Sequence, residues 1–190
     1  MSKFILCFSV FLIISCGDSK ETKKIEKTEA PLFESNLTEA DRKALANASG
    51  RSMESISIAD LYRKMDKAKG KLHLFCFWKL YNNDSKLFVK NLRDAHRELG
   101  QDQFNITYVN LDQQSLLKEI NVFVRELGIT EDILILSEPS EGQLFSNRNY
   151  NWNNQLPLLA LKNKSDGTNL FHQSNLSFEE LIAFLQPFLL

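Results

Sequence analysis

The sequence predicts an α/β fold in which helices cover both faces of a central mixed β-sheet. Three observations lead to this prediction. Leu72 to Trp78 is an almost continuous apolar run, the pattern of a strand covered on both faces. Ser85 to Leu99 repeats apolar residues with a period near 3.6, the pattern of a helix with one buried stripe. Asn105 to Leu111 is a second strand, and two strands joined through such a helix run parallel with a right-handed crossover.

Helix-start patterns lie before the central strand and after it. Thr38 to Asp41 can cap a short helix that runs towards Asn47. Ser57 to Asp60 starts a second helix, which we expect to end near Lys69-Gly70. After the central strand, Asp84 is the expected cap of the long helix, because aspartate accepts from exposed backbone amides.

The second half of the chain continues the alternation of helices and strands. We expect these elements in order: a helix from Leu116 to Leu127, a short extended piece from Ile133 to Leu136, a turn from Pro139 to Gly142, a strand from Leu158 to Leu161, a tight turn at Ser165 to Gly167, its hairpin partner from Asn169 to His172, and a helix opened by the capping box Ser177 to Glu180.

The N-terminus has the pattern of a secretory signal. Lys3 precedes an apolar run from Phe4 to Ile14, which is shorter than the roughly 20 residues of a membrane-spanning helix. The run ends in Ile13-Ile14-Ser15-Cys16, which resembles the lipobox of bacterial lipoproteins. This resemblance implies that residues 1–16 hold a lipoprotein signal peptide and that Cys16 is lipidated. The alternatives are an uncleaved apolar N-terminus and a plain signal peptide with an incidental cysteine.

The rest of the chain divides into a tether and one domain. Residues 17–36 are rich in Lys, Glu, Thr and Ser with few apolar residues, so we expect a flexible polar tether. Residues 37–190 are enough for a single domain. A lipid on Cys16 implies a membrane-anchored protein of the cell envelope. Gly17 suits transfer to an outer membrane, on its periplasmic or surface face, if the host is Gram-negative.

The cysteines leave little room for redox chemistry. Cys7 would be lost with the signal peptide and Cys16 would carry lipid, so only Cys76 keeps a free thiol. A single thiol cannot form an intramolecular disulfide. Cys76 stands between Phe75 and Phe77, and burial in such surroundings raises a thiol pKa and makes the group inert. We therefore expect Cys76 to be a core residue.

The order of elements resembles the thioredoxin fold, and in detail the TlpA-like group of membrane-anchored thioredoxins. The resemblance covers roughly Ser55 to Leu190 and depends on the order and spacing of several short motifs: Ser57 to Leu61, Lys69-Gly70-Lys71, Phe77-Trp78, Val109 to Asp112, Leu156-Pro157 and Lys164 to Gly167. It implies a thioredoxin-like fold with a cis bond before Pro157. It also implies that the loop at Tyr81 to Ser85 faces the loop at Asn153 to Pro157, where ligands bind in open α/β sheets.

The chain departs from this family at its chemistry. Where a redox member has Cys-x-x-Cys, this chain has Asn82-Asn83-Asp84-Ser85, none of which can form a thiolate. We therefore expect no catalytic residue. We expect instead a redox-inactive domain that binds a protein or peptide of the envelope beside Pro157. The expected contact residues are Tyr81, Asn82, Asn83, Trp152, Leu156 and Pro157.

Two other functions remain open on the sequence. One is a thiol-disulfide oxidoreductase that acts through Cys76 or through a thiol supplied by a partner. The other is a glycan or small-ligand binder that uses Tyr81, Tyr150, Trp152 and the neighbouring asparagines.

Charge and histidine spacing argue against other classes of protein. The 23 basic and 24 acidic residues form no basic footprint, so we expect no nucleic-acid partner. His73, His96 and His172 fall on different elements without a cysteine or carboxylate at ligand spacing. We therefore expect neither a metal site nor a cofactor.

Overall fold

The computed structural model describes residues 53–68, 70, 72–137, 144–145, 152–173 and 175–189 of the 190-residue chain. By its internal contacts the chain divides into residues 1–36 and 37–190, and every described residue belongs to the second unit. The expected signal peptide, Cys16, the tether, the short helix towards Asn47 and the turn from Pro139 to Gly142 all lie outside the described residues.

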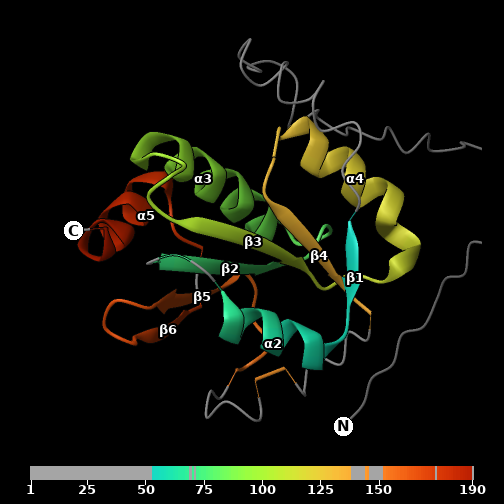
Figure 1. Cartoon of the computed structure of the whole chain (residues 1–190). Helices are drawn as coiled ribbons and strands as arrows, with labels where there is room; N and C mark the ends of the chain where they lie inside the picture. The colour runs from blue at the N-terminus through green and yellow to red at the C-terminus, as the bar shows by residue number, and fades with distance from the viewer. Residues whose placement is uncertain are drawn as a thin grey trace, which may run out of the picture. The chain divides into compact units, whose positions relative to one another are not determined.

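A six-stranded mixed sheet forms the centre of this unit, in the order β1-β4-β3-β2-β5-β6 (Figure 1). The strands are β1 (Glu54–Ile56), β2 (Leu72–Trp78), β3 (Asn105–Asn110), β4 (Asp132–Leu136), β5 (Leu158–Asn163) and β6 (Asn169–His172). Neighbours from β1 to β2 are parallel, whereas β2–β5 and β5–β6 are antiparallel. The predicted parallel pairing of β2 with β3 and the predicted hairpin of β5 with β6 are both confirmed.

Helices cover both faces of the sheet, as the sequence predicts. They are α2 (Ile58–Lys67), α3 (Asn83–Leu99), α4 (Leu117–Glu126) and α5 (Phe178–Leu185), with the short 3-10 turns η2 (Gln114–Leu116) and η5 (Gln186–Phe188). One hydrophobic cluster packs α3, α4 and α5 against the sheet, and a second packs α2 on the opposite face. In Figure 1, α3 and α5 accordingly lie across the sheet from α2.

Local interactions explain where the helices begin. The Ser57 hydroxyl accepts from the Asp60 backbone N–H at 3.1 Å and so caps α2. Ser177 and Glu180 form the reciprocal capping box that opens α5. The expected cap of α3 is wrong: Asn82, not Asp84, is the N-cap, and Asp84 lies within the first turn. Asn82 takes the extended backbone conformation of a cap, and its side chain accepts the Ser85 N–H. The helix therefore already begins at Asn83, which leaves Asp84 inside its first turn.

Sequence patterns did not show how the far edge of the sheet is built. β1 is three residues long, and Glu54 to Ile56 pair in parallel with Leu134 to Leu136 of β4. The short extended piece that the sequence predicts is therefore an inner strand between β1 and β3. In the part of the chain that the structure describes, no helix is long and apolar enough to span a membrane.

Candidate functional site

The candidate site starts at the loop between β2 and α3. The Asn82 side-chain carbonyl accepts the Ser85 backbone N–H at 2.8 Å, so the amide closes the first turn of α3. Asn82 and Ser85 occupy the two positions at which the resemblance would place thiols. Ser85 is buried, and its hydroxyl has no hydrogen-bond partner among the described residues.

Asp112 holds this loop against the end of β3. Its carboxylate accepts the Leu80 backbone N–H at 2.6 Å and the Asn110 side-chain amide at 2.9 Å. The Leu111 N–H also donates to the Trp78 carbonyl at 3.0 Å. Asp112 is buried, so these bonds are shielded from water and tie the loop to two strand ends.

The second loop of the site ends in Pro157. The Leu156-Pro157 bond is cis, as the resemblance implied. The Trp152 indole N–H donates to the Gln155 carbonyl at 2.9 Å, and the Gln173 amide donates to the same carbonyl at 3.0 Å. Gln173 also donates to the Asn153 side chain. The loop is therefore fixed from within by Trp152 and from the end of β6 by Gln173.

The two loops meet around one hollow of about 510 Å³, which we call the amide groove. It is lined by Lys79, Asn82, Asp84, Asn154, Gln155, Leu156, Pro157, Gln173 and Asn175. The structure thus brings three of the six expected contact residues, Asn82, Leu156 and Pro157, into one groove.

The other three expected contact residues lie differently. Tyr81 precedes the cap and is 74% exposed, the highest value among the large hydrophobic side chains that the structure describes. Asn83 is exposed in the first turn of α3 but does not line the groove. Trp152 is only 8% exposed because its ring packs into the core against Phe145, so it offers no open face to a ligand. Tyr150 lies outside the described residues. A sugar-stacking site therefore loses its main support.

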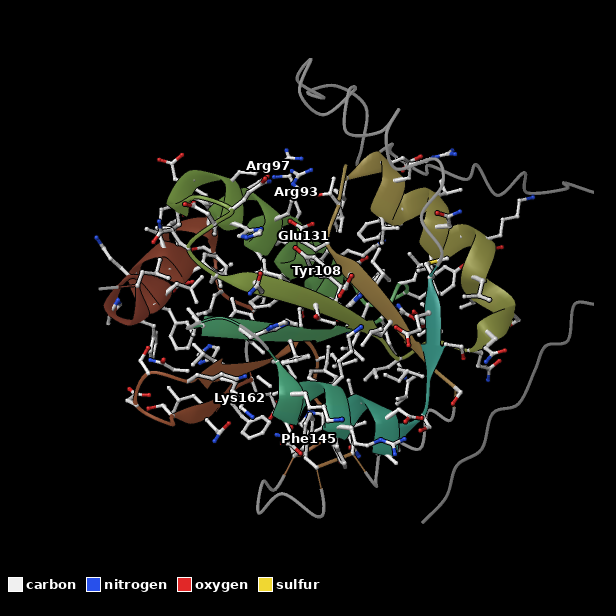
Figure 2. The ribbon with its side chains drawn as sticks, in the orientation of Figure 1. Arg93, Arg97, Tyr108, Glu131, Phe145 and Lys162 are labelled. Atoms are coloured by element: carbon white, nitrogen blue, oxygen red, sulfur yellow. The ribbon has the colours of Figure 1, made fainter. Side chains whose placement is uncertain are left out.

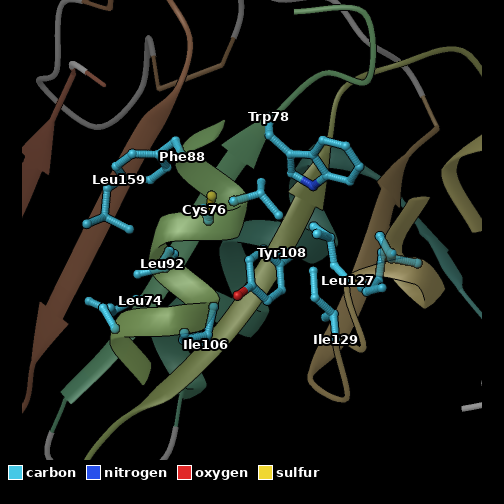
Figure 3. Packing of buried hydrophobic residues seen from close by; sticks show 14 of the residues in the cluster. Leu74, Cys76, Trp78, Phe88, Leu92, Ile106, Tyr108, Leu127, Ile129 and Leu159 are labelled. Atoms are coloured by element: carbon cyan, nitrogen blue, oxygen red, sulfur yellow. The ribbon is translucent and has the colours of Figure 1, made fainter. Parts of the chain in front are cut away.

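Cys76 lies in β2 with no exposed surface (Figure 3). Burial raises the pKa of its thiol far above the usual value, so the thiolate is strongly disfavoured. Its partner on the adjacent strand β3 is Tyr108. This side chain is equally buried, and its hydroxyl has no hydrogen-bond partner among the described residues. Burial, and secondarily the negative charge of Glu131, raises the pKa of Tyr108 as well. Neither group is placed to react with a molecule in solution.

A second hollow, of about 780 Å³, lies where β2, β3 and β4 begin, at the opposite end of the sheet. Among its lining residues, His96 donates from Nε2 to the Phe104 carbonyl at 3.0 Å, and its Nδ1 forms a hydrogen bond with the Glu131 carboxyl group at 2.9 Å. Burial opposes ionisation of Glu131, but its hydrogen bonds, above all with His96, outweigh burial and hold its pKa below the usual value. In Figure 2, Glu131 is drawn close to Arg93 and Arg97 of α3.

Sequence reasoning missed the second hollow because its lining residues are scattered from Arg63 to Asp132 and share no motif. His73 and His96 both line it, which their sequence spacing does not indicate. Across the described ranges, no group of three or more His, Cys, Asp or Glu side chains could hold a metal ion.

The strand order and the helices on both faces of the sheet match one known architecture. The fold is thioredoxin-like. A solved thiol:disulfide interchange protein of the thioredoxin family from Chlorobium tepidum TLS superposes with a TM-score of 0.53 at 12% identity, covering 64% of this chain and 81% of that one. A thioredoxin-related protein from Neisseria meningitidis serogroup B gives 0.52 at 10% identity, covering 65% and 89%. At such identities the likeness shows the fold alone. No protein-family model matches this chain, and no curated protein matches it either.

Proposed function

We propose that this protein is a lipid-anchored component of the cell envelope whose thioredoxin-like domain binds a protein or peptide in the amide groove without exchanging disulfides. The observation that carries the proposal is the composition of the groove. Side-chain amides, one lysine and one aspartate stand around Pro157, where a redox enzyme needs an accessible thiolate. The one thiol that the structure describes is buried inside β2.

The groove also has the form that a binding site needs. Its volume falls in the range of about 300–1,000 Å³ typical of ligand sites. Two loops that are each held by their own hydrogen bonds form its walls, so little ordering cost is left for the moment of binding. Leu156 is only partly buried and precedes Pro157, where an extended segment can pair with the backbone.

Site-specific photo-crosslinking in the producing cells tests the binding function. A photoreactive phenylalanine analogue placed at Tyr81 should give a discrete protein adduct, since this ring is exposed beside the groove. The matched control is the same analogue at Leu170 on β6, which is also exposed but does not line the groove. The proposal fails if Tyr81 gives no adduct or the same adducts as Leu170.

Membrane attachment is tested separately. The Cys16→Ser variant should move the protein from the membrane fraction to the soluble fraction, whereas Cys7→Ser should leave it with the membrane. A Cys16→Ser protein that stays with the membrane would overturn the lipid anchor but not the binding site.

The competing enzyme hypothesis is a thiol-disulfide oxidoreductase, the activity named for the Chlorobium tepidum structure. Reduction of insulin disulfides is the direct assay. We expect no turnover above the rate with dithiothreitol alone. Turnover that disappears with Cys76→Ala would establish the enzyme and overturn our proposal.

A further inference from the structure

The amide groove has an unusual composition for its size. Five carboxamides line it: Asn82 before α3, Asn154 and Gln155 before Pro157, and Gln173 and Asn175 after β6. Among the described residues that line it, Lys79 and Asp84 are the charged ones, and they have opposite signs. The described lining therefore has many hydrogen-bonding groups and no net charge.

Much of this hydrogen-bonding capacity is not used within the part of the chain that the structure describes. A carboxamide offers two N–H donors and one carbonyl acceptor. Asn82 uses only its carbonyl, which caps α3, and its NH₂ group bonds to no described residue. The Asn154 side chain has no hydrogen bond with the described residues and is exposed. Asn175 makes only a long contact of 3.5 Å to Asp84.

Free carboxamides favour partners of a particular chemistry. They pair equally well with donors and acceptors, as peptide groups, amide side chains and hydroxyl groups provide. A carboxylate or ammonium group entering the groove would lose hydration without gaining an unopposed counter-charge. A neutral polar segment loses less and can satisfy both kinds of group.

Exposed apolar side chains stand next to this polar surface. Tyr81 immediately precedes Asn82, and Leu87, 50% exposed, lies one helical turn after the groove residue Asp84. Residues three apart on a helix are surface neighbours. A bound segment that leaves the groove along α3 would therefore meet an apolar contact.

We propose that the amide groove binds an extended peptide segment rich in uncharged polar side chains (Asn, Gln, Ser and Thr), with one large apolar side chain packed against Tyr81 and Leu87. This inference rests on the proposed binding function and adds the chemistry of the partner. Asn82 and Asn154 are its specificity-determining residues.

Nuclear magnetic resonance titration tests this chemistry directly. ¹⁵N-labelled residues 17–190, which contain the whole domain with both hydrophobic clusters, are titrated with a blocked peptide Ser-Gln-Ser-Leu-Gln-Ser-Gln. The same peptide with every Gln replaced by Glu, the same with Lys, and chitotetraose are titrated in parallel. The side-chain NH₂ signals of Asn82 and Asn154 report the site itself. We expect them to shift with the glutamine peptide, and we expect about tenfold weaker binding of the two charged peptides, as the loss of one or two hydrogen bonds implies.

Substitutions that keep the size and shape of the side chain make the variants informative. Asn82→Asp keeps a carbonyl-type acceptor at the cap, and Asn154→Asp keeps a residue that tolerates the left-handed backbone found there, φ 64°. Together they remove two NH₂ donors, so the double variant should bind the glutamine peptide about tenfold more weakly. The matched control, Gln103→Glu with Gln113→Glu, adds the same two charges at exposed amides outside the groove and should bind like the unaltered domain.

The outcomes separate this inference from the function on which it rests. Equal or tighter binding of a charged peptide in the groove overturns the inference while the binding function stands. The same holds if no probe shifts the two NH₂ signals but Tyr81 still gives its specific adduct. Shifts with chitotetraose alone, or failure of both experiments, overturn the inference and the proposed function together.

Discussion

The buried state of Cys76 gives the sharpest quantitative prediction. Its side chain has no exposed surface, so a thiol reagent can reach the sulfur only when the protein unfolds around it. Domains of this kind have unfolding free energies of at least about 5 kcal/mol, which leaves roughly one molecule in several thousand open at any time. We therefore expect Ellman's reagent to modify native Cys76 at least about a thousandfold more slowly than the unfolded chain.

The assay follows thiol modification of residues 17–190 in rising urea. The rate should increase exponentially with urea, with the slope of global unfolding, because no smaller opening exposes the centre of β2. The matched control is Cys76→Ala combined with Ser115→Cys, which places the only thiol on the exposed turn η2. Its modification rate should hardly change between native and unfolded protein.

Fast modification of native Cys76 would refute this reasoning. A rate within about tenfold of the unfolded chain, independent of urea, would mean that the sulfur is reachable in the folded state. Cys76 would then be a candidate for thiol chemistry, and the strongest objection to the enzyme hypothesis would be removed.

Three further predictions concern groups near the two hollows. Asn82→Ala removes the cap of α3 and should lower the free energy of unfolding by about 1 kcal/mol, whereas Asn83→Ala, within the first turn, should change it by less than about 0.5 kcal/mol; urea denaturation measures both. Ser85→Ala removes a buried hydroxyl that has no partner among the described residues, so the same assay should show equal or higher stability, by up to about 1 kcal/mol. The pKa of Glu131 is lowered in the folded state, so its contribution is present above the unfolded pKa near 4.3 and is lost as the pH falls through the folded value; stability should therefore drop more steeply below about pH 5 in the unaltered protein than in Glu131→Gln.

Each of these predictions has a clear contrary result. Equal losses for the two asparagine variants would mean that the cap does not hold the loop. A loss above about 1 kcal/mol for Ser85→Ala would indicate that the hydroxyl has a partner. Parallel pH profiles for the unaltered protein and Glu131→Gln would mean that the bond to His96 has no effect on stability.

The sequence predicted the elements that carry a strong period of their own. β2 is continuously apolar and α3 keeps one apolar stripe over 17 residues, so both were identified without knowledge of their partners. β1 has only three residues and no alternation, and it exists because β4 lies beside it. A strand that depends on a partner more than 70 residues away has no local signal to detect.

The candidate site was predictable in position but not in detail. The position came from the resemblance around Leu156-Pro157, and the groove was found there. The burial of Trp152 was not predictable, because a tryptophan in a polar loop can either stack on a ligand or pack beneath the loop. Its packing depends on Phe145, an earlier residue of the same segment, and no helical or strand pattern in the sequence connects the two positions. The choice of Asn82 over Asp84 as cap depended on backbone angles at two residues that are both good caps.

The groove keeps its shape by means that need no sulfur. On one side Asn82 supplies a neutral acceptor to the amide of the first turn of α3, and Asp112 holds Leu80 at 2.6 Å. On the other side Trp152 and Gln173 converge on the Gln155 carbonyl. Because these bonds join side chains to backbone groups and involve no thiol, the spacing of the two loops does not depend on a redox state. A groove built in this way keeps its shape under both oxidising and reducing conditions, whereas a site held by a disulfide does not.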